Sequence, residues 1–216
     1  MNTDTTRGTV PLWEMALRQW NVYKERYDFD KAFSYVLAVD RASADAKMKM
    51  CLSENVLGGE VTIPQNGHDR IPEVLVIPAA TIPMEIQLIH FLKKEYVEAT
   101  EFRRVFSTHI SCESYGEEYP YLIHNVELGY DTKGFSEIVV NDWLRDRGRR
   151  MLYFDEVLAL VMLRPSLLDD HAMLAGMSRW KDNEYPGFIK KLGGIVFDTT
   201  SFKKQGSVWG VPTCSI

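Results

Sequence analysis

The feature that most restricts the fold of this chain is a stripe of large side chains near its start. The members recur at steps of three and four residues, the spacing that places side chains on one face of an α-helix. They are Trp13, Ala16, Trp20, Tyr23 and Tyr27. We therefore expect a helix over residues 11–27, with Pro11 in its first turn. An apolar face of this kind must be covered, so the fold has to supply a second layer.

A second apolar stripe begins after a short connection. Asp28 or Asp30 can cap this second helix, and its apolar residues are Phe33, Val36, Leu37, Ala44, Met48, Cys51 and Leu52. Two consecutive amphipathic helices predict an N-terminal helical hairpin, with Trp20 and Phe33 buried. The aromatic stripe could instead be an exposed surface for a protein partner or a second copy of the chain. We favour burial, because such a stripe is more often half of a core.

Residues 56–70 contain the densest set of turn-forming residues in the chain, among them Gly58-Gly59, Pro64 and Asn66-Gly67. Such a set indicates a loop or an internal boundary. A chain of 216 residues is long enough to build one core without disulfides. We expect a single domain over residues 1–216, with a possible sub-boundary near 55–70 between a helical hairpin (1–54) and an α+β core (71–216).

The core segment opens with strand-like sequence. Val74-Leu75-Val76-Ile77 is a continuous apolar run and predicts a buried strand. Residues 84–96 have helical spacing, and residues 102–110 and 119–128 are rich in strand-forming residues.

Two short helices and several strands complete the predicted order. Ser136 can cap a helix that ends at Gly148, with an inner face of Val139, Val140, Trp143 and Leu144. Residues 154–163 predict a second helix, stopped by Pro165. Strands are expected at residues 172–177, 187–190 and 195–199 and near Val208, with a hairpin at Gly193-Gly194. This order predicts an α+β fold, in which the helical hairpin packs on a mixed, mostly antiparallel sheet with short helices on one face.

Composition excludes several classes of partner. The net charge of −5 and the pI of about 5.6 argue against nucleic-acid binding, and the basic run at residues 145–150 suits a helix end. The N-terminal residues lack the apolar core of a secretory signal, and no stretch approaches the roughly 20 apolar residues of a membrane span. Three cysteines without a Cys-x-x-Cys pair indicate reduced thiols. We expect a soluble cytoplasmic protein with no nucleic-acid partner and no cofactor.

A series of short motifs runs from Tyr119 to the C-terminus. It comprises Val126-Glu127-Leu128-Gly129, Gly148-Arg149, Leu152-Tyr153-Phe154-Asp155-Glu156, Pro165, Gly176-Met177-Ser178-Arg179, Pro186, Trp209-Gly210 and Cys214. In this order the motifs resemble a bacterial family of unknown function, found mainly in actinobacteria. Tyr153 stands where that family has threonine, so Glu156 keeps only half of a capping box. The resemblance implies an architecture, and it implies no mechanism.

The candidate ligand-binding residues lie inside these motifs: Arg149, Glu156, Arg179, Trp209 and Cys214. Arg149 and Arg179 could converge on an anion, for which the guanidinium fork is suited. We favour internal pairs, and we expect Arg149 to bind Asp155 or Glu156. Those two adjacent carboxylates could act as general acid and base, but neighbours on a helix point about 100° apart. Stabilisation of the helix start is the simpler role.

Two other constellations give weaker signals. His109, Cys112, Glu113 and His124 contain metal-ligand types, but His109 and Cys112 have opposite parity on a strand, so we expect no metal site. Cys214 has no neighbouring helix N-terminus or cation to activate it as a nucleophile.

Familiar catalytic and nucleotide-binding motifs are absent from the sequence. Ser178 lacks the Gly-x-Ser-x-Gly elbow, and neither a Walker loop nor Gly-x-Gly-x-x-Gly occurs. The favoured hypothesis is a non-enzymatic protein that binds a protein or a small ligand. The alternative is a hydrolase or transferase that uses Arg149, Glu156, Arg179 and the Trp209–Cys214 tail.

Overall fold

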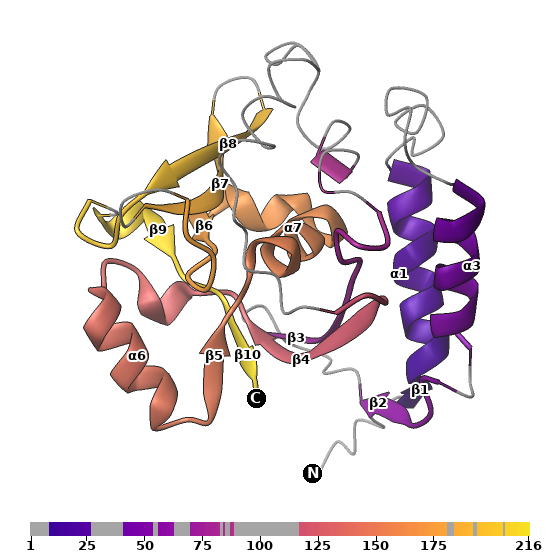
Figure 1. Cartoon of the computed structure of the whole chain (residues 1–216). Helices are drawn as coiled ribbons and strands as arrows, with labels where there is room; N and C mark the ends of the chain where they lie inside the picture. Colours follow the sequence, from indigo (N-terminus) through magenta and orange to yellow (C-terminus); the bar gives the residue numbers. More distant parts are fainter. Residues whose placement is uncertain are drawn as a thin grey trace, which may run out of the picture.

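The computed structural model describes residues 9–26, 41–53, 56–62, 70–82, 84, 87–88, 117–180, 184–191, 194–204 and 206–216 (Figure 1). Within these ranges the chain forms one two-stranded and two four-stranded sheets together with helices. None of the described helices is both long and apolar enough to cross a bilayer.

The first described elements form a small ribbon and a helix. Strand β1 (Thr9–Pro11) pairs antiparallel with β2 (Glu60–Thr62), and the amide of Leu12 donates to the carbonyl of Gly59 at 3.0 Å. Helix α1 (Leu12–Arg26) follows directly and confirms the predicted helix. Pro11 ends β1 instead of lying in the first helical turn, and Tyr27 lies outside the described residues. The turn-rich segment thus contributes a strand that the sequence did not predict.

The apolar face of α1 is buried, as expected. Ala16, Trp20 and Tyr23 are 0%, 8% and 1% exposed and belong to the main core cluster. The Tyr23 hydroxyl donates to the carbonyl of Leu75 at 2.9 Å. The side chain of Gln19 bonds the backbone of β3 on both sides, donating to Glu73 O at 2.8 Å and accepting from Leu75 N at 2.7 Å. Because β3 is a sheet edge, Gln19 acts as a substitute strand partner there.

The second N-terminal helix is described over α3 (Arg41–Cys51). Met48 and Leu52 are buried in the same cluster as Trp20 and Tyr23. The expected caps Asp28 and Asp30, and the residues Phe33, Val36 and Leu37, lie outside the described residues. The sub-boundary near 55–70 stays a prediction.

The first four-stranded sheet has the order β3-β4-β10-β5 and is antiparallel throughout. Its strands are β3 (Arg70–Val76), β4 (Tyr121–Glu127), β10 (Thr213–Ser215) and β5 (Arg149–Met151). The buried strand predicted at Val74–Ile77 and the strand predicted at 119–128 are confirmed. Of the helix predicted at 84–96 only Met84, Gln87 and Leu88 are described, and these three are helical; residues 102–110 lie outside the described ranges.

The second four-stranded sheet has the order β8-β7-β6-β9. It consists of β8 (Gly194–Thr200), β7 (Tyr185–Lys191), β6 (Ala172–Leu174) and β9 (Trp209–Gly210). Its pairs are antiparallel except β6–β9, which is parallel. Strands β7 and β8 form the hairpin that the glycine pair predicted.

Helix α7 (Phe154–Leu163) lies between the two four-stranded sheets (Figure 1). It packs against both β3 and β7, and every residue from Phe154 to Met162 is buried. A helix that is buried on all sides is apolar around its whole circumference, which is the pattern of this segment after Glu156. Its bounds match the predicted helix, and Pro165 begins the 3-10 turn η2 (Pro165–Asp169).

Helix α6 (Glu137–Arg145) covers a second, smaller cluster. Ser136 caps it as predicted, accepting from the amide of Val139 at 3.4 Å. Of the predicted inner face, Val140 and Leu144 are buried, Trp143 is half-buried and Val139 is 46% exposed. The helix ends at Arg145, and Gly148, with φ of +60°, turns the chain into β5.

The α+β class is confirmed, with the strands in two mostly antiparallel four-stranded sheets rather than one. The predicted arrangement of both helices on one face is replaced by α7 between the sheets and α6 beside β5. One sheet could not cover the all-round apolar surface of α7, whereas two sheets can. The remaining short elements are η1 (Tyr130–Thr132) and η3 (Gly206–Val208).

Candidate functional site

The alternation of side chains along β5 decides where two consecutive arginines point. Side chains of neighbouring residues leave opposite faces of a strand. Arg150 lies opposite Cys214 of β10, and Arg149 lies opposite Ser215. Arg150 and Cys214 share the face covered by α7, which we call the inner face. Arg149 lies on the other, outer face.

On the inner face, Arg150 forms a bidentate pair with Glu156 at the start of α7. Nη1 donates to Oε2 at 2.7 Å and Nη2 donates to Oε1 at 2.6 Å. Tyr121 donates to Oε1 at 3.2 Å, and the amide of Tyr153 donates to Oε2 at 2.8 Å. The predicted pairing of Arg149 with Asp155 or Glu156 is therefore wrong. The strand alternation assigns that role to Arg150.

The pKa values in this cluster follow from burial and from the ion pair. Burial alone would lower the pKa of Arg150, but the hydrogen bonds and charge of Glu156 outweigh it and raise the pKa above its usual value. Burial, with the charges of Asp155 and Glu156, raises the pKa of Tyr121. Both groups keep their protons throughout the physiological range.

Asp155 is the one member of the cluster poised to titrate. Its side chain is 3% exposed, and burial followed by the charge of Glu156 raises its pKa to about 7. Oδ1 accepts from the amide of Glu156 at 3.0 Å, whereas Oδ2 has no hydrogen-bond partner among the described residues. The carboxyl is enclosed, so it has no path to a substrate that would make it a general acid.

The start of α7 is capped by a residue far along the chain. Ser178 Oγ, fully buried, accepts from the amide of Phe154 at 2.9 Å. Glu156 supplies the reciprocal half of the capping box through the amide of Tyr153. Ser178 thus binds the first amide of the helix, whereas the amide of Glu156, which a threonine at position 153 would bind in a capping box, donates to Asp155 Oδ1 at 3.0 Å.

Cys214 lies beside this cluster and is 1% exposed. Burial raises the pKa of the thiol to about 11, even though Arg150 acts to lower it. A thiol with this pKa is protonated near neutral pH and is a poor nucleophile.

On the outer face, Arg149 joins three strands. It is 6% exposed, its Nε and Nη2 donate to Thr213 Oγ1 and Thr213 O, each at 3.0 Å, and Nη2 donates to Asn125 O at 2.6 Å. Nε also lies 3.3 Å from Glu127 Oε2.

The backbone of Asn125, which accepts from Arg149, has an unusual conformation. Its φ is +51°, a value that asparagine tolerates better than most residues. In the register, Asn125 lies across from Pro72, which has no amide hydrogen to donate.

The other predicted candidates lie elsewhere. Arg179 is 65% exposed and lies 3.7 Å from Glu137. Trp209 is buried in the second cluster, where its ring occupies the space above Gly187. The structure therefore places Arg179 and Trp209 apart from the cluster around Glu156.

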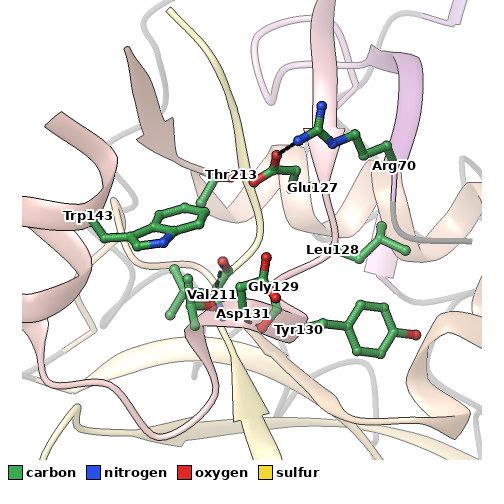
Figure 2. Close-up of a pocket in the computed structure, with 10 residues that line it drawn as sticks. Arg70, Glu127, Leu128, Gly129, Tyr130, Asp131, Trp143, Val211 and Thr213 are labelled. Atoms are coloured by element: carbon green, nitrogen blue, oxygen red, sulfur yellow. Dashed lines mark hydrogen bonds and ion pairs between the residues drawn. The ribbon is translucent and has the colours of Figure 1, made fainter. Parts of the chain in front are cut away.

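A pocket of about 370 Å³ lies over the outer face of the first sheet (Figure 2). It is lined by Arg70, Glu127, Leu128, Gly129, Tyr130, Asp131, Thr132, Trp143, Val211 and Thr213. Three of these side chains follow one another across the sheet, because Arg70 pairs with Glu127 and Glu127 pairs with Thr213 in the register. Directly paired residues share a face. We call this the outer-face pocket.

The floor of the outer-face pocket depends on a close backbone contact. Gly129 has φ of +87°, and a Cβ there would lie 2.8 Å from the backbone N and C of Val211, so only glycine fits. Thr132 Oγ1 accepts from Val211 N at 2.8 Å and lies 3.0 Å from Gly129 O and Val211 O. The floor is therefore fixed by hydrogen bonds before any ligand arrives.

Charged and aromatic side chains form the walls. Arg70 Nη2 lies 2.6 Å from Glu127 Oε1, with exposed fractions of 60% and 15%. The guanidinium of Arg147 lies over the ring of Trp143 in α6, 4.2 Å from the ring centroid. Tyr130 donates to Asp170 at 2.7 Å. The pocket thus combines an ion pair, an indole and a tyrosine.

A buried histidine supports one of these walls. His171 contacts the Tyr130 ring at 4.5 Å between centroids and bonds the carbonyl of Leu128 through Nε2 at 2.8 Å. Burial lowers its pKa, so the ring is neutral at pH 7 and Nε2 carries the donated proton. The neutral imidazole holds Tyr130 and Leu128 in place without adding charge to the pocket.

Sequence reasoning missed Arg70, Asp131 and Trp143 as site residues. The helical spacing predicts Trp143 on the inner face of its helix, and Arg70 lies far from the other pocket residues along the chain. The resembling motif at Val126–Gly129 does supply Glu127 and the glycine floor, so it was the usable signal.

No group of three metal-ligating side chains occurs in the part of the chain that the structure describes. His124 forms a cross-strand ion pair with Glu73, and the hydrogen bond to Glu73 raises its pKa. His109, Cys112 and Glu113 lie outside the described residues. Comparisons with protein-family models, curated proteins and solved structures find no match to this chain.

Proposed function

We propose that this protein acts by binding a small polar ligand in the outer-face pocket, and that it is not an enzyme. The observation that carries the proposal is the row Arg70, Glu127 and Thr213 beneath a pocket of about 370 Å³ with Trp143 as one wall. Small-molecule sites in proteins are concave, of this order of volume, and contain a few convergent polar groups.

The rigidity of the site supports binding by a preformed cavity. Arg149 ties Thr213 and Asn125 together, and Thr132 ties Gly129 to Val211. Preorganised walls reduce the cost of ordering on association. The inner-face cluster does not compete as a reaction centre, because Glu156 is saturated with hydrogen bonds and Cys214 is protonated.

The expected location and relationship of the protein are part of the same proposal. Cys51 and Cys214 are free and buried thiols, which agrees with a reducing cytoplasm. We also propose that the chain belongs to the resembling actinobacterial family, on its sequence motifs alone. Three of these motifs have structural roles. The Leu128-Gly129 turn forms the pocket floor, Arg149 ties the strands, and Ser178 caps α7.

A direct test is a ligand screen with a reporter in the pocket. The full chain is labelled with 5-fluorotryptophan, and the resonance of Trp143 is assigned by Trp143→Phe. A library of small cations, anions, zwitterions and neutral polar compounds is then titrated while fluorine NMR follows all five tryptophans. We expect members of one class to shift Trp143 and leave Trp20 unchanged, because Trp20 lies in the core behind β3. If no class moves Trp143, the proposal is wrong.

A protein partner or second copy on the N-terminal helices is a second candidate. Trp20 and Tyr23 are buried, so this surface would have to use the exposed Leu17 and Met50, at 37% and 51%. Sedimentation velocity of the parent and of Leu17→Glu/Met50→Glu tests it. A monomer in both cases rejects self-association.

A further inference from the structure

The charges around Glu127 do not cancel. Its carboxylate is shared by two guanidiniums, Arg70 at 2.6 Å and Arg149 at 3.3 Å. Two positive charges and one negative charge leave an excess of about one positive charge at this end of the outer-face pocket. An anionic group of a ligand would neutralise it.

Burial of Arg149 makes this excess positive charge energetically unfavourable when the pocket is empty. Its side chain is almost fully buried, and removing a guanidinium from water is unfavourable unless charge and hydrogen bonds compensate. Burial lowers its pKa, Glu127 raises it, and the nearby charge of Arg70 lowers it again. The two guanidiniums are therefore close enough to repel each other, and Arg70 is the one with free access to a ligand. It is 60% exposed, and its ion pair uses a single nitrogen.

A different part of the pocket carries the opposite charge. Asp131 is exposed, lines the pocket, and makes no hydrogen bond or ion pair with any described residue. It belongs to η1, directly after Tyr130. A free carboxylate at this position suits an ammonium group or another donor.

Apolar surface lines another side of the pocket. Trp143 and Val211 both line the pocket, and Figure 2 shows the indole at the side opposite Arg70 and Tyr130. Arg147 covers one face of the indole ring, so the other face is the flat surface left for an aliphatic or aromatic group of a ligand.

We infer that the outer-face pocket takes a small zwitterion of the amino-acid type, with its carboxylate at Arg70, its ammonium group at Asp131 and its side chain against Trp143. This inference rests on the proposed function and names the ligand class. A phosphate fits less well, because a dianion exceeds the single surplus charge and faces both Glu127 and Asp131.

The test uses matched probes on the fluorotryptophan-labelled full chain. L-leucine carries both charges, L-leucinamide lacks the carboxylate, N-acetyl-L-leucine lacks the ammonium group, and inorganic phosphate represents the competing anion. We expect L-leucine to shift Trp143 at the lowest concentration, and each singly charged probe to bind at least about tenfold more weakly. Phosphate should bind more weakly than N-acetyl-L-leucine.

Three variants locate the two charges. Arg70→Gln should weaken L-leucine and N-acetyl-L-leucine about tenfold and leave L-leucinamide within about twofold. Asp131→Asn should weaken L-leucine and L-leucinamide and spare N-acetyl-L-leucine. Arg18→Gln is the matched control, because Arg18 has similar exposure, 63%, and also pairs with one glutamate; its affinities should equal those of the parent. All three positions are exposed, and an unchanged Trp20 resonance confirms that each variant is folded.

The outcomes separate the two proposals. If L-leucinamide binds as well as L-leucine, if phosphate binds more tightly than either carboxylate probe, or if Arg70→Gln has no effect, the zwitterion inference is wrong while ligand binding in the pocket stands. If no probe and no library class shifts Trp143, both fail together.

Discussion

Arg150 donates hydrogen bonds to both carboxylate oxygens of Glu156, at 2.7 and 2.6 Å, across the junction between β5 and α7. Glu156 is fully buried and Arg150 is 18% exposed, so the pair is largely shielded from water. Bidentate geometry fixes the entry angle of α7 as well as neutralising the charge.

We expect Arg150→Met to lower the free energy of unfolding by about 3–5 kcal/mol, because it leaves Glu156 buried and uncompensated. The double variant Arg150→Met/Glu156→Gln should lose less than the sum of the two single variants. Urea denaturation of the four proteins gives the coupling energy. Strict additivity would mean that the pair contributes nothing.

Arg149 should also be important for stability, through partners other than those the sequence indicated. Arg149→Ala removes its bonds to Thr213 and Asn125 and should cost about 3–5 kcal/mol. Arg149→Lys should recover only part of this stability, because a lysine ammonium cannot reproduce the several donors of a planar guanidinium. Arg179→Ala is the control, since that side chain is 65% exposed and should cost about 0–1 kcal/mol. Equal denaturation midpoints for Arg149→Ala and the parent would refute this role.

Asp155 should make stability fall as pH rises. Its pKa is raised from 3.8 to about 7 in the folded protein, so the folded state binds a proton that the unfolded state releases. This contribution is fully present below pH 3.8 and is lost as the pH rises through 7. Asp155→Asn keeps the acceptor for the amide of Glu156 and cannot ionise. The variant should be more stable than the parent at pH 8, with a smaller difference between pH 5 and pH 8. Chemical denaturation at both pH values measures this, and identical pH dependence in both proteins would contradict it.

The cap supplied by Ser178 can be compared with an exposed cap. Ser178→Ala leaves the buried amide of Phe154 without its acceptor at 2.9 Å and should cost about 1–2 kcal/mol. Ser136→Ala, at the exposed start of α6, loses a longer bond of 3.4 Å and should cost less. Thermal denaturation of the two variants ranks them. The reverse order would show that Ser178 is not the effective cap.

Burial of the N-terminal stripe gives a last prediction. Trp20→Ala should cost about 3–5 kcal/mol, because the indole is 8% exposed in the main cluster. Leu17→Ala, on the exposed side of the same helix, should change stability by about 0.5 kcal/mol or less. An unchanged melting temperature for Trp20→Ala would argue against the core role.

Local sequence patterns predicted most of the helices and strands. They could not predict which distant strands pair with one another. The bounds of α7 follow from its apolar run and from Pro165, and the hairpin of β7 and β8 follows from its glycines, since each signal is local. The sheet order β3-β4-β10-β5 is not local, because it brings Thr213 between Glu127 and Met151. The short strand β5 was not predicted either, so the sequence could not place Arg149 and Arg150 on opposite faces of a sheet.

The outer-face pocket could not be foreseen for the same reason. Arg70, Glu127 and Thr213 become neighbours only through cross-strand pairing, and Trp143 reaches them from α6. The motif Val126–Gly129 was singled out in the sequence as part of a resemblance, without a predicted pocket.

The position of residues 209–215 in the two sheets has a consequence for synthesis on the ribosome. Strand β9 completes the second sheet beside β6, and after two residues β10 enters the first sheet between β4 and β5. Until this segment has emerged, β5 has no strand beside it, and Arg149 lacks the hydroxyl and carbonyl of Thr213. A chain that lacks this segment therefore leaves β4, β5 and β6 each with an unpaired edge, and such edges are open to mispairing until residues 209–215 take their places.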